Sequence, residues 1–154
     1  MQLATSDPRA SPNKGTVTMI EQAVVKRRIL VIDEDAESRN ALSHQLGVLS
    51  FEVTTEDNGV SGLARVAHGL DSAPFHGLFL ELDMKGLGGM AVLQEMVDRF
   101  PSVAVIVMSD AKNIGKLRRA MKVGAKEYLV KPFDPELVRR KCLSVFLEEK
   151  GLES

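Results

Sequence analysis

Acidic, hydroxyl and ammonium side chains stand at the ends of short apolar runs in this 154-residue chain. They are Asp33 and Glu34 after the first run, Glu81 at the third, Ser109 after the fourth and Lys131 after the fifth. Three carboxylates, a hydroxyl and an ammonium group suit a hard, oxygen-seeking cation such as Mg²⁺ with a phosphoryl group beside it. If the runs are neighbouring strands, these side chains predict one pocket for phosphoryl chemistry.

The apolar runs are short, hydrophobic and rich in β-branched residues, which is typical of parallel strands covered on both faces. They occupy Ile29–Ile32, Phe51–Thr55, Leu78–Leu80, Val103–Met108 and Glu127–Val130. Segments with apolar residues at helical spacing lie between the runs, and Leu137–Leu147 closes the series. Gly124 suits a helix C-cap, and Asp134 with Pro135 suits an N-cap followed by the first helical position.

Five strands alternating with five helices predict an α/β fold, a doubly wound five-stranded parallel sheet with helices on both faces. In the order 2-1-3-4-5 the first and third strands are neighbours. Asp33, Glu34 and Glu81 would then converge on one pocket, with Ser109 and Lys131 on its flank. Ligand sites of such sheets lie beyond the carboxyl ends of the strands, which is where the pocket is expected.

Length and composition predict one globular domain, because 44% of the residues are apolar and 27% are charged. The formal net charge of -1 gives no general attraction to nucleic acid or to a membrane, so neither is expected as a partner. Cys142 is the only cysteine and has helical spacing to apolar neighbours, which predicts a buried thiol. No apolar run is long enough for a signal peptide, and we expect a cytoplasmic protein.

The predicted domain occupies residues 28–150. Residues 1–27 are rich in turn-forming side chains and offer little to bury, so we expect a disordered or weakly ordered tail. Residues 151–154 form a short C-terminal tail. The sequence says nothing firm about oligomeric state.

From about Arg28 to Glu148 the sequence resembles the receiver domains of two-component response regulators, of which the chemotaxis receiver is one. Four features, which follow one another along the chain, carry the resemblance. They are the acidic group that ends Ile29–Asp35, the loop Met84–Gly89 against the family's Met-Pro-x-x-x-Gly, Ser109 at the fourth strand, and Tyr128–Phe133 at the fifth. The resemblance implies a flavodoxin-like fold.

The resemblance also implies a weak Mg²⁺ site and no other cofactor. Asp33 and Glu34 would hold the ion, and Asp83 would offer its backbone carbonyl to it. An alternative is that the acidic residues after the first strand supply a helix N-terminus with negative charge.

Three more roles follow from the resemblance. Ser109 would sense the phosphoryl oxygens, Lys131 would pair with the acceptor carboxylate, and Tyr128 would report the switch through its rotamer. The peptide bond between Lys131 and Pro132 would be cis. The alternatives are that Ser109 ends a strand and that Tyr128 packs at the edge of the core.

The sequence departs from the family at the position that matters most, because Glu81 replaces the phosphate-accepting aspartate. Lys85 replaces the usual loop proline, and Asp110 replaces a small residue. Glu81 adds one methylene group, in chemistry where a misplacement of about 1 Å can slow the reaction about a hundredfold. We therefore expect weak or absent phosphorylation.

Two consequences of Glu81 stay open. Its longer side chain brings negative charge toward Ser109 and Lys131, where a phosphoryl group would sit, and so imitates the phosphorylated state. In the other reading the pocket has lost its switch and is retained for folding. Asp83 is a further, less favoured acceptor, because it follows the strand end.

The leading functional hypothesis is a stand-alone signalling module that binds a protein partner and is not an enzyme. A second is a conventional receiver that takes a phosphoryl group from a histidine kinase. A third is a Mg²⁺-dependent enzyme on a flavodoxin-like sheet. The sequence contains no nucleotide-binding loop, which counts against this hypothesis.

Positive charge is concentrated late in the chain, with ten Lys or Arg against three Asp or Glu between Ala111 and Lys141. We expect an interaction face for an acidic protein partner there, although a solvated helix face would have the same pattern. Its predicted residues are Lys116, Arg118, Arg119, Lys122, Arg139 and Arg140.

Overall fold

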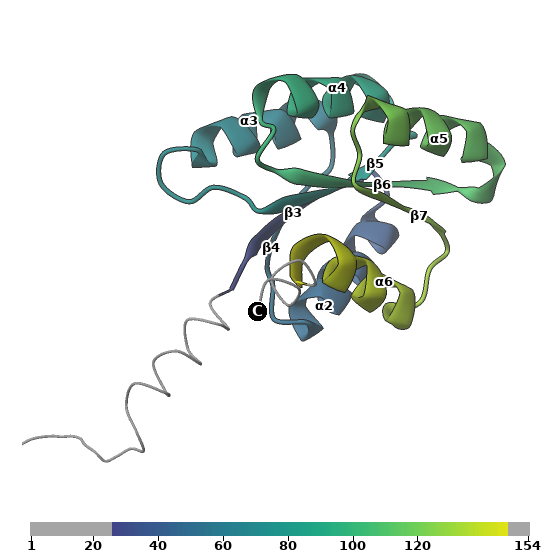
Figure 1. Ribbon diagram of the computed structural model, residues 1–154, viewed down its shortest axis with the longest axis horizontal. Helices are drawn as coiled ribbons and strands as arrows, with labels where there is room; N and C mark the ends of the chain where they lie inside the picture. The colour runs from purple at the N-terminus through teal and green to yellow at the C-terminus, as the bar shows by residue number, and fades with distance from the viewer. Residues whose placement is uncertain (1–25, 148–154) are drawn as a thin grey trace, which may run out of the picture.

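One parallel sheet forms the centre of the protein in a computed structural model that describes residues 26–147 (Figure 1). The strands lie in the order β4-β3-β5-β6-β7, and the predicted order 2-1-3-4-5 is confirmed. Their bounds are β3 (Arg28–Ile32), β4 (Glu52–Glu56), β5 (Gly77–Glu81), β6 (Ala104–Asp110) and β7 (Glu127–Lys131).

Five helices cover the two faces of the sheet, which confirms the predicted doubly wound α/β class. One face carries α3 (Gly59–Gly69), α4 (Gly89–Arg99) and α5 (Ile114–Val123), and the other carries α2 (Ala36–Val48) and α6 (Pro135–Cys142) (Figure 1). A 3₁₀ turn, η1 (Ala111–Asn113), leads from β6 into α5. The last predicted helix begins at Pro135, where its proline was predicted, but it is not continuous to Leu147: α6 ends at Cys142 and passes into a π turn, η2 (Leu143–Leu147).

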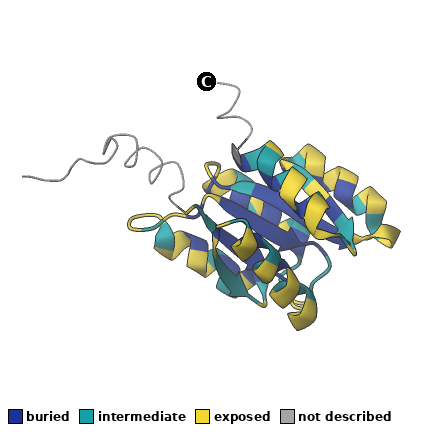
Figure 2. Cartoon of the chain, turned by 90° about the horizontal axis from the view of Figure 1, so that it is seen from below, coloured by how far each residue is buried: buried dark blue, intermediate teal, exposed yellow. Residues whose placement is uncertain are grey.

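The core lies in two layers, because successive residues of each strand point to opposite faces. From β3, Leu30 and Ile32 pack in the layer under α3, α4 and α5, whereas Ile29 and Val31 pack in the layer under α2 and α6. The sheet is therefore buried between outward-facing helix surfaces that stay exposed (Figure 2). Cys142 is buried in the second layer, as predicted.

Local side-chain signals set several helix ends. The Asp134 side chain accepts a hydrogen bond from the Leu137 backbone N–H, and Pro135 opens α6, as predicted. Gly124 ends α5 with φ 145°, a conformation that L side chains rarely adopt. Asp35 caps α2 by accepting from the Ser38 backbone N–H at 2.9 Å, so part of the acidic cluster after β3 serves the helix.

Most of both predicted tails lies outside the described residues. Of residues 1–27, Lys26 and Arg27 are described, and they precede β3 without helix or strand. Residues 151–154 and the end of the predicted domain, 148–150, are likewise outside. Within residues 26–147, no helix is both long and apolar enough to cross a membrane.

Candidate functional site

The floor of the pocket consists of two buried carboxylates and one ammonium group. Asp33 follows β3 and Glu81 ends β5, and only 1% and 5% of their respective surfaces are exposed. Lys131, at the end of β7, places its Nζ atom 2.7 Å from Asp33 Oδ2 and 2.5 Å from Glu81 Oε1. Because parallel strands end at one edge of the sheet, three predicted site residues meet although 98 positions separate Asp33 from Lys131.

Burial and pairing set the charges of this floor. Burial raises the pKa of Glu81, while hydrogen bonds from the Lys131 ammonium and from the Asp83 backbone N–H oppose that rise. Burial lowers the pKa of Lys131, but hydrogen bonds to Asp33 and Glu81 outweigh it and raise that pKa above its usual value. Lys131 is therefore positively charged and supplies the counter-charge of the floor.

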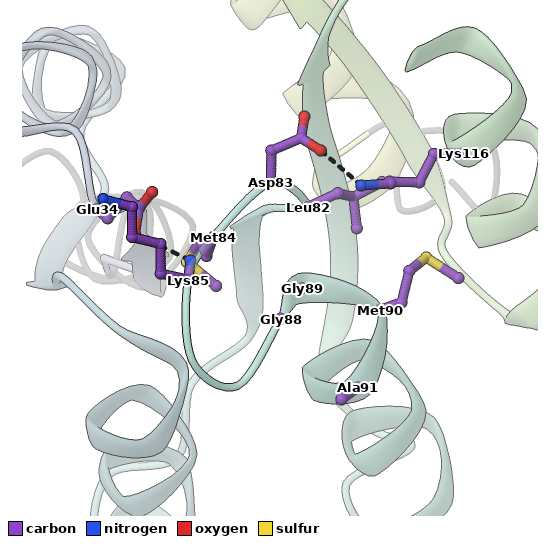
Figure 3. Close-up of a pocket in the computed structure, with 10 residues that line it drawn as sticks. All are labelled: Glu34, Leu82, Asp83, Met84, Lys85, Gly88, Gly89, Met90, Ala91 and Lys116. Carbon is purple, nitrogen blue, oxygen red and sulfur yellow. Dashed lines mark hydrogen bonds and ion pairs between the residues drawn. The ribbon is translucent and has the colours of Figure 1, made fainter.

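A second polar cluster lies beside the floor and centres on the Asp83 side chain. Asp83 Oδ2 accepts from Ser109 Oγ at 2.5 Å and from Asn113 Nδ2 at 2.9 Å, and Oδ1 lies 2.6 Å from Lys116 Nζ. The Asp83 carboxylate and the Lys116 ammonium face each other in Figure 3, above the loop that leads into α4. The cluster joins the β5–α4 loop to the end of β6 and the start of α5.

This cluster differs from the expected roles in two respects. The Ser109 hydroxyl donates to Asp83, whereas the Glu81 carboxylate takes its bonds from Lys131 and from the Asp83 backbone N–H. Lys116, predicted on the interaction face, directs its ammonium to Asp83, and 30% of its side chain stays exposed. Asp83 thus contributes its side chain to this cluster, whereas the resemblance implied a role for its backbone carbonyl.

Asn113 is a site residue that sequence reasoning missed. A usable signal was present, because Asn113 and Lys116 are three positions apart and share a side of a helical turn directly after Ser109. The Asn113 amide also lies 3.3 Å from Asp110 Oδ1. Asp110 itself caps η1 by accepting from the Lys112 backbone N–H.

The Mg²⁺ site that the resemblance implies consists of two side chains and a backbone carbonyl, and both side chains make hydrogen bonds within the protein. Asp33 Oδ1 accepts from the Asp35 backbone N–H at 3.0 Å, and its Oδ2 faces Lys131. Glu34 is exposed and accepts from the Lys85 backbone N–H at 3.1 Å. Across residues 26–147, no three His, Cys, Asp or Glu side chains are grouped so that they could hold a metal ion.

Tyr128 lies on the surface at the predicted interaction face, with 40% of the residue exposed. The Lys141 ammonium stands 4.9 Å from the centre of its ring and also pairs with Glu127. A hollow of about 520 Å³ between α5 and β7 lies beside the ring. Its lining combines apolar and basic side chains, namely Ile114, Leu117, Arg118, Met121, Lys122 and Tyr128.

The remaining predicted interface residues are exposed, but they belong to two helices on opposite faces of the sheet. Arg118, Arg119 and Lys122 lie on α5. Arg139 and Arg140 lie on α6, where both face Glu136, at 2.7 Å and 3.9 Å. The basic face is therefore strongest along α5, and β7 stands between its two parts (Figure 1).

Comparison with known proteins places these observations in a family. A model of the response regulator receiver domain matches residues 29–142. The transcriptional regulatory protein QseB of Haemophilus influenzae and the DNA-binding transcriptional regulator NtrC of Escherichia coli are each 32% identical over 106 residues, or 69% of this chain. These matches cover 46% of QseB and 22% of NtrC, so the chain spans less than half the length of either.

Solved structures agree on the fold. NtrX from Brucella abortus, in complex with ADP, has a TM-score of 0.74 at 27% identity, over 84% of this chain and 29% of NtrX. A response regulator receiver domain protein from Clostridium thermocellum has a TM-score of 0.73 at 26% identity, over 83% of this chain and 99% of the other. The chemotaxis protein CheY4 of Vibrio cholerae has a TM-score of 0.70 at 23% identity, over 79% and 100%, which bears on the fold alone. The family match, on a fold that these structures share, means that the chain belongs to the response regulator receiver domains of two-component signalling.

Proposed function

We propose that this receiver is a cytoplasmic, non-enzymatic signalling module that acts by binding a protein partner, with weak or no phosphorylation. Receiver domains interact with histidine kinases and with other proteins, so protein binding is the activity common to the family.

The observation that carries the proposal is the state of the Glu81 carboxylate. Lys131 Nζ lies 2.5 Å from Glu81 Oε1, and the Asp83 backbone N–H donates to Oε2 at 2.9 Å. Both oxygens are therefore held, on a side chain one methylene group longer than aspartate. Because a displacement of about 1 Å can slow group transfer about a hundredfold, this geometry disfavours attack on a donor phosphorus atom.

The basic surface along α5 supports an acidic protein partner. Arg118, Arg119 and Lys122 are exposed beside a partly apolar hollow of about 520 Å³. Apolar anchors in such hollows contribute binding energy, and charge complementarity contributes specificity. QseB and NtrC are named transcriptional regulators, and NtrC is named as DNA-binding. For residues 26–147 we propose contact with protein and not with nucleic acid.

The test is incubation with a small-molecule phosphodonor and Mg²⁺, followed by intact-mass measurement. The wild type should gain no stable phosphoryl group, whereas Glu81→Asp should gain some, because aspartate returns the shorter side chain. Glu81→Gln is the matched control, since it keeps the length and removes the nucleophilic carboxylate. Stoichiometric labelling of the wild type would overturn the proposal.

The second candidate is a conventional receiver that accepts a phosphoryl group from a histidine kinase. The observation that favours it is the meeting of Asp33, Glu81 and Lys131 at the pocket floor. If the wild type is labelled, Glu81→Gln and Asp83→Asn separate the two acceptors, since loss of label in one variant identifies the carboxylate that carries the group.

A further inference from the structure

Three hydrogen-bond donors from successive parts of the chain converge on one point beside the pocket. Ser109 is the second-last residue of β6, Asn113 ends η1, and Lys116 lies in the first turn of α5. Their hydroxyl, amide and ammonium groups all reach the Asp83 carboxylate, at 2.5, 2.9 and 2.6 Å. Neutral and charged donors aimed at one place form a site for an oxyanion, and bonds to an ionised group are the stronger kind.

The occupant of that site is part of the chain. Both oxygens of Asp83 accept, so the carboxylate satisfies all three donors as an external oxyanion would. Partial burial raises its pKa, but the bonds from Lys116, Ser109 and Asn113 hold the pKa of the Asp83 carboxyl below its usual value. Asp83 is therefore an anion at neutral pH.

We propose that Asp83 is an internal anion that fills a three-donor oxyanion site and thereby holds the start of α5 in one position. The inference deepens the proposed function, on which it rests, because it names the group that engages Ser109 in place of a phosphoryl group. The chain would then keep its α5 surface in a set geometry without any modification of Glu81.

The link to the surface runs through α5 itself. Lys116 is bound to Asp83, and Arg118 and Arg119 follow within the next turn of the same helix. A regular helix moves as a unit over so short a distance, so a shift at Lys116 displaces both arginines. The Lys116–Asp83 pair is about a third exposed, at 30% and 34%, and solvent screening limits its strength. We expect effects of severalfold, not of many orders of magnitude.

The first experiment opens the site. In Asp83→Ala the three donors lose their occupant, so inorganic phosphate should bind and raise the melting temperature in a concentration-dependent way. Ionic strength is held constant by exchange against chloride. The wild type should show no such rise, and Asp83→Ala combined with Lys116→Met should lose it. No response in a folded Asp83→Ala protein would overturn the oxyanion site.

The second experiment reads the position of α5. Backbone amides of residues 110–117 should exchange with solvent about five times faster in Asp83→Asn than in the wild type, since the loss of one charge-assisted bond weakens local protection. Glu95→Gln is the matched control, because it removes an exposed carboxylate paired with Arg99 on α4. Unchanged exchange in Asp83→Asn would overturn the inference.

These outcomes are distinct from those of the phosphodonor test. Inorganic phosphate transfers no phosphoryl group, so its binding to Asp83→Ala is independent of Glu81 chemistry. A wild type that is labelled on Glu81 would overturn the proposed function. Lys116→Met supplies a second reading if Asp83→Ala does not fold: faster exchange over residues 110–117 supports the inference, and unchanged exchange contradicts it.

Discussion

Lys131 Nζ lies 2.5 Å from Glu81 Oε1, an ion pair that joins β7 to β5 across the intervening strand β6. The same ammonium also holds Asp33, so its removal would leave two buried carboxylates facing each other. We expect Lys131→Met to lower the free energy of unfolding by about 3 kcal/mol, because breaking a buried pair leaves uncompensated charge. Urea denaturation followed by circular dichroism measures the change.

The control for this substitution is Arg99→Met. Arg99 pairs with Glu95 at 3.0 Å, but both side chains are largely exposed, so the loss should stay within about 0.5 kcal/mol. Equal destabilisation of the two variants would show that Lys131 does not carry the charge balance of the pocket.

The sequence could predict the floor of the pocket because strand order alone fixes it. Asp33 and Glu81 stand at the carboxyl ends of neighbouring parallel strands, and Lys131 stands at the same edge two strands from Glu81, within reach of its long side chain. The partner of Ser109 could not be predicted in the same way. Asp83 lies beyond the strand, and the direction of its side chain depends on the path of the β5–α4 loop, which tertiary packing decides.

The path of that loop brings the backbone of Glu81 and Leu82 very close to Gly89. A Cβ atom added there would lie 2.4 Å from the Glu81 carbonyl oxygen and 2.4 Å from Leu82 Cα. Both contacts are with backbone, which yields less readily than the end of a side chain. We expect Gly89→Ala to destabilise the protein by about 2 kcal/mol and to shift the resonances of Glu81 and Asp83 in NMR spectra.

Gly88 provides a neighbouring control for this prediction. A Cβ atom there has Met84 O at 3.9 Å as its nearest contact, and φ is -72°, so alanine fits. Gly88→Ala should therefore change the free energy of unfolding by less than about 1 kcal/mol, because the smaller entropy of the unfolded chain offsets the poorer N-cap. If the two variants melt alike, the close approach at Gly89 does not constrain the loop.

Acid should weaken the packing around His76. Burial, with Arg27 and Arg28 nearby, lowers the pKa of His76, whose Nδ1 accepts from the Arg28 backbone N–H at 3.0 Å. The folded state thus binds a proton less readily than the unfolded chain. Stability from neutral His76 is fully present above about pH 6.5 and is lost as pH falls toward the folded pKa.

The measurement compares wild type and His76→Gln by urea denaturation. Between about pH 7.5 and 5.5 the wild type should lose more stability than the variant, whereas the two should run parallel above about pH 7.5. An identical acid dependence in both proteins would contradict the assignment to His76.

Helix ends show where local sequence signals suffice and where they do not. Asp134, Pro135 and Gly124 act through their own side chains or backbone angles, and each was predictable from type and position. The change from α6 to the π turn after Cys142 was not, because apolar spacing over Leu137–Leu147 is compatible with an uninterrupted helix. The cis bond at Lys131–Pro132 was predicted from the family resemblance and is confirmed.

The basic surface of α5 can be tested without its natural partner. Arg118→Glu with Arg119→Glu reverses two exposed charges, so retention on a poly-glutamate resin should fall strongly at low salt. For the wild type, retention should decline as salt rises above physiological strength, where the screening length drops below about 8 Å. The unfolding free energy of the double variant should change by less than about 1 kcal/mol, since exposed charges contribute little to stability.

Reversing Arg65 and Arg99 to Glu changes the net charge by the same amount, but on α3 and α4, and is the matched control. If this control loses retention equally, net charge and not the α5 surface governs binding to acidic partners.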